Sequence, residues 1–274
     1  MFDTVIEMLS YPFMTRAFLV GSLVALCSAL LGVSLVLKRY SMIGDGLSHV
    51  GFGAMAIAAA MNAAPLTIAI PVVIVAAILL LRISGNAKIK GDAAIALIST
   101  TSLAVGVMVI SLTTGMNTDV YNYMFGSILA MSAEDVKLSL VLSVFVLILF
   151  IVFYHKIFAI TFDETFARAT GVKARVYNTL IAVLTAVTIV LGMRMMGALL
   201  ISSLIIFPAL TSMRVCRTFK SVIINAAVIS VVCLIAGVTL SYVAATPAGA
   251  SVVLANLVMM VLYTVVGAVK NHMR

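Results

Sequence analysis

Long apolar runs constrain the fold of this chain more than any other feature of its sequence. Of its 274 residues, 64% are hydrophobic and only 9% are charged, which is far from the balance of a soluble globular domain. A helix of roughly 20 apolar residues crosses the hydrocarbon core of a bilayer, which is about 30 Å thick. Runs of about this length lie at 13–37, 41–62, 65–82, 93–113, 136–154, 177–194, 195–213, 221–243 and 250–269. The sequence therefore predicts an all-α, polytopic membrane protein.

The number of spans depends on the runs 177–194 and 195–213, which only Gly192, Arg194 and Gly197 interrupt. We therefore expect eight or nine spans, and the segment 121–131 could add a half-span or a re-entrant piece. The polar segments between the runs are too short to fold separately. Residues 1–274 are thus expected to form one transmembrane domain.

The basic residues indicate an orientation, because Lys and Arg concentrate in cytoplasmic loops. With the N-terminus outside, all of the 17 basic residues except Arg16, Lys137 and Arg194 fall in inner segments. We expect the N-terminus outside and the C-terminus in the cytoplasm, provided that the number of spans is odd. Because this topology explains the net charge of +8, the charge gives no reason to expect a nucleic-acid partner.

An aspartate and a histidine interrupt the apolar segment 41–62, where residues 43–53 read IGDGLSHVGFG. If a helix begins near Ser41, Asp45 lies roughly 6 Å and His49 roughly 12 Å along its axis. Residues four apart share one helical face, so both side chains can reach one ligand. A carboxylate at such depth costs at least roughly 2.5 kcal/mol, so it needs a partner, a water-filled cavity or an ion.

Three interpretations of this pair remain open. The two side chains form structural hydrogen bonds, or they relay protons, or they bind a divalent transition metal transiently. Imidazole and carboxylate are both ligands for such metals. Two ligands are fewer than a structural zinc site uses, which is consistent with transport, where an ion must also leave. We favour the metal interpretation.

The segment around this pair, residues 38–58, reads KRYSMIGDGLSHVGFGAMAIA. It resembles the signature of the membrane permease subunits of bacterial zinc, manganese and iron ABC importers. Further segments resemble that family in the same order: KGDAAIALI (90–98), YMFGSILAMSAEDV (123–136), FDETFARATGV (162–172), MGALLISSLIIFPALTSMRV (196–215) and TPAGASVVL (246–254). One departure is PALTSMR at 208–214, where the family more often has Pro-Ala-Ala-Thr-Ala-Arg.

The resemblance implies an ATP-driven importer in the bacterial plasma membrane that passes a divalent metal ion by alternating access. Its implied partners are a second copy of the chain, cytoplasmic ABC ATPase subunits, an extracytoplasmic metal-binding protein and membrane lipid. The ion is cargo, with no permanently bound cofactor; zinc is favoured over manganese or iron, because MFGSILAMS and TPAGASVVL look closer to zinc-type relatives. The chain contains no G-x-x-x-x-G-K-[ST] phosphate loop, so it is not expected to be an enzyme.

The segment 162–172 is expected to form a short amphipathic helix on the cytoplasmic side. Asp163 can cap its start, and Gly171 can adopt the left-handed conformation that ends it. The alternative is an interfacial helix lying on lipid. The resemblance favours a coupling helix that fits a cleft of the ATPase, through Phe162, Asp163, Glu164, Phe166 and Arg168.

The main alternative function is a proton-coupled secondary metal carrier, in which Asp45 and His49 form the proton relay. A permease for vitamin B12 or a siderophore is closer in kind to the importer. A large organic ligand, however, gives no reason for an aspartate and histidine pair.

Overall fold

Ten helices and no strand make up the part of the chain that the computed structural model describes, residues 10–84, 91–113 and 132–272. The helices are α2 (Pro12–Leu37), α3 (Ser41–Ala60), α4 (Pro65–Ser84), α5 (Gly91–Thr113), α7 (Ala133–Val152), α8 (Tyr154–Phe162), α9 (Glu164–Ala169), α10 (Ala174–Met213), α11 (Phe219–Ala244) and α12 (Ala248–His272). The prediction of an all-α polytopic bundle is confirmed. The segment 121–131 lies outside the described residues.

Eight of these helices are long and apolar enough to cross a membrane, and only α8 and α9 are not. This number lies within the predicted range of eight or nine. The predicted spans 177–194 and 195–213 both fall in α10, which is 40 residues long.

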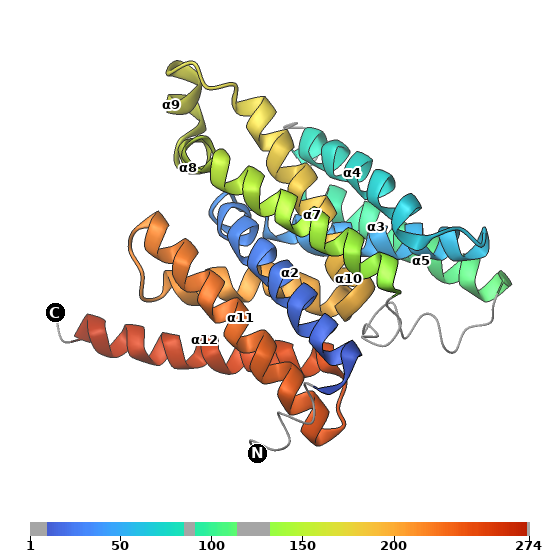
Figure 1. The fold of residues 1–274 in the computed structure, drawn as a ribbon. Coiled ribbons are helices and arrows are strands. Elements are labelled where there is room, and N and C mark those ends of the chain that lie inside the picture. Colours follow the sequence, from blue (N-terminus) through green and yellow to red (C-terminus); the bar gives the residue numbers. More distant parts are fainter. Residues whose placement is uncertain (1–9, 85–90, 114–131, 273–274) are drawn as a thin grey trace.

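Helix α10 is two helical arms joined by a sharp bend at Gly197. The backbone there has φ 83° and ψ 163°, a conformation that is essentially restricted to glycine. Ile201 packs directly against Gly192, although nine residues of straight helix would separate them by about 13 Å. In Figure 1 the two arms run in different directions. The range of α10 therefore contains two helical segments, which the sequence predicted as separate spans.

The core of the bundle is formed by α2, α3 and α10, the three long helices that are most buried. Helix α3 packs against α5, α4 and α10, while α10 also contacts α2 and α12. Close packing between α3 and α5 depends on Gly53, because a Cβ atom there would lie 2.7 Å from the carbonyl oxygen of Ser102. Small residues allow such close backbone approach between membrane helices.

The link between α2 and α3 meets α8, α9 and the start of α10 at one end of the bundle. Lys38 Nζ donates to the carbonyl oxygen of Ile160, at 3.1 Å, and to Asn178 Oδ1, at 2.6 Å. Tyr40 and Arg82 line the same pocket as Glu164 of α9. We call this end, defined by Lys38, Arg82, α8, α9 and the start of α10, the basic end.

The second arm of α10 returns to the basic end. Ser212 Oγ donates to the carbonyl oxygen of Val222 in α11, at 2.8 Å. Phe219, the first residue of α11, packs against the rings of Phe158 and Phe162, at centroid distances of 5.1 and 5.6 Å. The backbone of Arg214 also lies against Gly267 near the end of α12. Both ends of α10 and the last turns of α12 thus lie at the basic end.

Candidate metal-transport site

Asp45 and His49 lie on one face of α3, as the sequence predicted. His49 Nε2 and Asp45 Oδ2 are 3.7 Å apart, which is too long for a hydrogen bond. Two ligand atoms on a tetrahedral zinc ion, each about 2.1 Å from the metal, lie about 3.4 Å apart. The spacing of this pair therefore suits a shared ion better than a direct hydrogen bond.

Ser202, which follows the bend in α10, lies beside the carboxylate of Asp45. Ser202 Oγ lies 3.3 Å from Asp45 Oδ1 and 3.2 Å from the carbonyl oxygen of Ala198, so its single proton can serve either acceptor. Ser48 Oγ donates to the backbone oxygen of Asp45, at 2.7 Å. The neighbouring helix thus supplies a hydroxyl that can orient the carboxylate.

Neither member of the pair is fully enclosed by its own chain. The side chain of Asp45 is 44% exposed and that of His49 is 25% exposed. Within the described ranges, no group of three or more His, Cys, Asp or Glu residues is placed to hold a metal ion. One copy of the chain therefore presents a carboxylate, an imidazole and nearby hydroxyls on an open face.

The expected helix at 162–172 is observed as α9, but it is shorter than predicted. Asp163 is its N-cap, since Asp163 Oδ1 accepts from the backbone N–H of Phe166 at 2.8 Å. Gly171 has φ 83°, as expected for the residue that follows a helix end. Phe162, however, is the last residue of α8, because the extended backbone of Asp163 separates the two helices.

Phe162 and Phe166 consequently differ in their surroundings, although both are more than half exposed. Phe162 contacts the rings of Phe158 and Phe219, whereas Phe166 is 65% exposed on α9. Of the two, Phe166 is the aromatic side chain exposed on α9 itself.

Glu164 joins α9 to two other helices, a role that the sequence did not reveal. It accepts from Lys38 Nζ at 3.2 Å and from Asn178 Nδ2 at 2.9 Å, and it also pairs with Arg168. Burial of Glu164 raises its pKa, but the hydrogen bonds from Asn178 and Lys38 outweigh that effect and lower the pKa. Burial lowers the pKa of Lys38 more than Glu164 raises it. This network fixes α9 against the last turn of α2 and the first turns of α10.

The fold and the site together define a class: a polytopic bundle of apolar helices that carries a polar face within it and a short helix at its basic end. The profile of the ABC 3 transport family matches residues 10–267. The chain therefore belongs to the ABC 3 transport family, and the resemblance seen in the motifs is confirmed.

Characterised relatives cover most of this chain. It is 30% identical over 246 residues to the high-affinity zinc uptake system membrane protein ZnuB of Haemophilus influenzae, a match that covers 90% of this chain and 94% of that protein. It is 28% identical over 248 residues to the manganese transport system membrane protein MntC of Halalkalibacterium halodurans, which covers 90% of this chain and 85% of that protein.

A solved structure is also similar, that of PsaBC from Streptococcus pneumoniae in complex with Fab. The TM-score is 0.86 at 26% sequence identity, and the match covers 95% of this chain and 94% of that chain. The similarity therefore extends through the bundle from α2 to α12.

Proposed function

We propose that this chain is the permease subunit of an ATP-driven importer of divalent transition-metal ions. The observation that carries the proposal is the open pair of Asp45 and His49 on α3, with atoms spaced for one ion and with Ser202 beside the carboxylate. Its relatives named for zinc and manganese uptake support the same cargo class. The chain binds and releases the ion by alternating access, and ATP hydrolysis takes place in a separate subunit.

The site is completed by a second copy of the chain. A carboxylate that is 44% exposed in a membrane-spanning helix is costly if it faces lipid, so protein or water must cover it. Two copies that place their α3 faces together would offer two carboxylates and two imidazoles, which is the ligand number of a closed zinc site. A delivery protein outside the membrane supplies the ion to this shared site.

Zinc is the proposed cargo, with manganese and iron as competitors. Imidazole and carboxylate together bind zinc more tightly than manganese or iron in the general order of divalent metals. Competition uptake of the three ions in cells that carry the complete importer would rank them directly. Uptake of manganese unaffected by excess zinc would contradict the zinc assignment.

The test of the site is metal uptake by two conservative variants. Asp45→Asn and His49→Gln each remove a ligand while keeping size and polarity, so uptake should fall by at least about tenfold, the effect of losing one charge-assisted contact. Glu134→Gln and His155→Gln make the same changes at exposed positions and should retain uptake. Normal uptake by both site variants, with normal amounts of protein in the membrane, would remove the assignment.

The proton-coupled carrier predicts a different energy source. If uptake survives ATP depletion and collapses with the proton gradient, that alternative replaces the importer. Loss of uptake on ATP depletion at constant proton gradient supports the importer.

The basic end is proposed to face the cytoplasm, where α9 would dock the ATPase. Phe166 is the main contact, Asp163 and Glu164 hold the helix in place, and Phe162 and Arg168 border it. Phe166→Ala should reduce ATPase co-purification by about tenfold, because exposed aromatic anchors dominate such interfaces. Phe145→Ala, an exposed aromatic on α7, is the control. Equal recovery of the ATPase with both variants would exclude this docking mode.

A further inference from the structure

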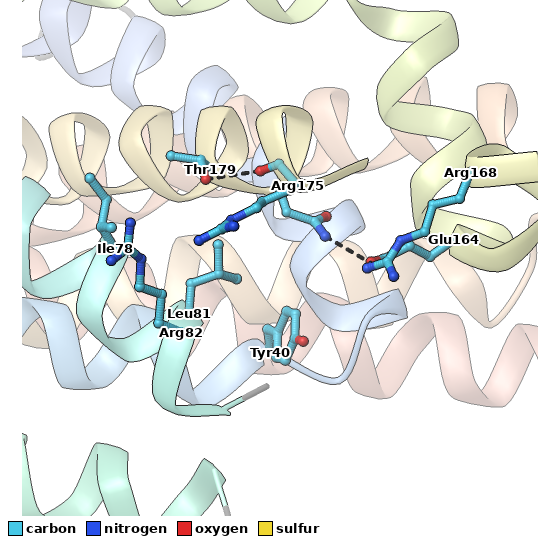
Figure 2. Close-up of a pocket in the computed structure, with 9 residues that line it drawn as sticks. Tyr40, Ile78, Leu81, Arg82, Glu164, Arg168, Arg175 and Thr179 are labelled. Carbon is cyan, nitrogen blue, oxygen red and sulfur yellow. Dashed lines mark hydrogen bonds and ion pairs between the residues drawn. The ribbon is translucent and has the colours of Figure 1, made fainter. Parts of the chain in front are cut away.

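A pocket of about 540 Å³ opens at the basic end between α4, α9 and the first turns of α10. Arg82 comes from α4, Glu164 and Arg168 from α9, and Arg175 from α10, while Ile78 and Leu81 provide apolar lining (Figure 2). Arginines from three separate helices thus converge on one opening that no part of the metal pathway uses.

The ion pairs among the described residues leave the charges of this pocket unbalanced. Glu164 is already paired with Lys38 and Arg168. Arg82 and Arg175 take part in none of the ion pairs among the described residues. In Figure 2 the side chain of Arg175 extends toward the part of the pocket where the guanidinium group of Arg82 lies. Like charges that face each other repel, and an anion between them converts the repulsion into two attractions.

Phosphate oxygens suit this arrangement. The planar guanidinium group binds phosphate through two parallel hydrogen bonds, and two arginines from different helices can hold one phosphate from two sides. A zwitterionic headgroup would bring a cation into the same arginine-lined opening. The pocket therefore favours a phosphate group with a net negative charge.

The surface of α4 below the pocket indicates where that phosphate comes from. Val72, Val75 and Leu79 are 42%, 57% and 49% exposed and lie on the same helical face as Arg82. This apolar stripe extends about 10 Å along the membrane-spanning helix, at 1.5 Å per residue. The acyl chain of a lipid can lie along this stripe while the headgroup of the same lipid reaches the arginines. A soluble anion has no acyl chain and would gain nothing from the stripe.

We propose that this pocket binds the phosphate of an anionic phospholipid, with Arg82 and Arg175 as its ligands and the α4 stripe as the contact for one acyl chain. Basic pockets between transmembrane helices on the cytoplasmic side are suited to such headgroups. Because Arg168 and Glu164 of α9 line the same pocket, the bound lipid also contacts the helix that we propose docks the ATPase. The lipid would therefore hold α9, α4 and α10 together at the membrane surface.

The test is native mass spectrometry of the full-length chain, purified in mild detergent and titrated with dioleoyl phosphatidylglycerol or dioleoyl phosphatidylcholine. The wild-type chain should retain phosphatidylglycerol preferentially. Arg82→Gln combined with Arg175→Gln should weaken that retention by about thirtyfold, because each arginine near the surface contributes about a factor of five. Arg217→Gln combined with Lys220→Gln removes the same charge from another exposed part of the basic end and should change it by less than about threefold.

Three results would overturn the proposal. They are equal retention of the two lipids by the wild-type chain, equal loss in the two double variants, and displacement of phosphatidylglycerol by millimolar inorganic phosphate, which would indicate a free-anion site. A double variant that keeps its lipid but loses the ATPase would indicate a protein docking site instead. If the glutamine variant fails to fold, Arg82→Lys combined with Arg175→Lys serves as the second variant. It keeps the charge but removes the paired hydrogen bonds of the guanidinium groups, so retention of phosphatidylglycerol should weaken by only about threefold to tenfold.

Discussion

Asp45 and His49 of α3 are the residues whose own chemistry points most directly to a ligand. A charge in an apolar helix is costly, so its presence already indicates a partner or an ion. Ser202 carries no such signal, because a serine in a membrane helix usually bonds to its own backbone, as Ser202 also can through Ala198. Only the packing of the second arm of α10 against α3 brings its hydroxyl to Asp45.

Replacement of Ser202 should show whether its hydroxyl orients the carboxylate. Ser202→Ala removes the donor to Asp45 Oδ1, so the apparent affinity for the metal should weaken by about threefold to tenfold with the maximal uptake rate largely kept. Concentration-dependent uptake of radioactive metal measures both quantities. Ser202→Thr keeps the hydroxyl and should behave like the wild type; equal losses in the two variants would mean that the hydroxyl is not the cause.

At the scale of single elements, α10 differs most from its sequence-based description. The two apolar runs and the residues that interrupt them, Gly192, Arg194 and Gly197, are evident in the sequence, but which of these residues makes the bend is not. The bend lets the second arm return across the bundle and bring Ser202 next to Asp45. A straight α10 would be about 60 Å long, which is twice the thickness of the hydrocarbon core.

Gly197→Ala should therefore damage the site from a distance. The conformation of Gly197 costs a residue with a Cβ atom about 1–3 kcal/mol, so the variant should unfold at a lower temperature and take up less metal. Gly171→Ala is the matched control, because Gly171 has the same φ of 83° but lies in an exposed turn with nothing within 4 Å of an added Cβ. It should lose stability of similar size and keep its affinity for the metal. Unchanged metal affinity in Gly197→Ala would show that the bend does not position the site.

At the scale of the whole molecule, the bend also decides on which sides the termini lie. Because both ends of α10 lie at the basic end, its first arm runs away from that end and its second arm returns to it. The two arms therefore count as two crossings of the bundle. The start of α2 and the end of α12 then lie at opposite ends of the bundle. Termini at opposite ends are what an odd number of crossings requires, and the orientation with the N-terminus outside stays a prediction.

Thiol labelling from each side of the membrane would test this orientation. Arg217→Cys, at the basic end, should react with a membrane-impermeant reagent only in inside-out vesicles, and Glu134→Cys, in the first turn of α7, only in intact cells. The native Cys216 beside the first position is replaced by serine in both variants. Labelling of both cysteines from the same side would contradict the proposed topology.

The sequence by itself determined the membrane-spanning helical architecture, the family, and the placement of Asp45 and His49 on one helical face, because each can be read from runs and motifs that are local in the chain. Apolar runs must leave water, and an acid and a histidine within such a run need a partner, water or an ion. Tertiary structure alone decided the fold of α10, the approach of Ser202 to Asp45, the bracing of α9 by Lys38 and Glu164, and the pocket of Arg82 and Arg175. Each of these joins residues far apart in the chain, and such contacts depend on how helices pack rather than on what any one helix contains.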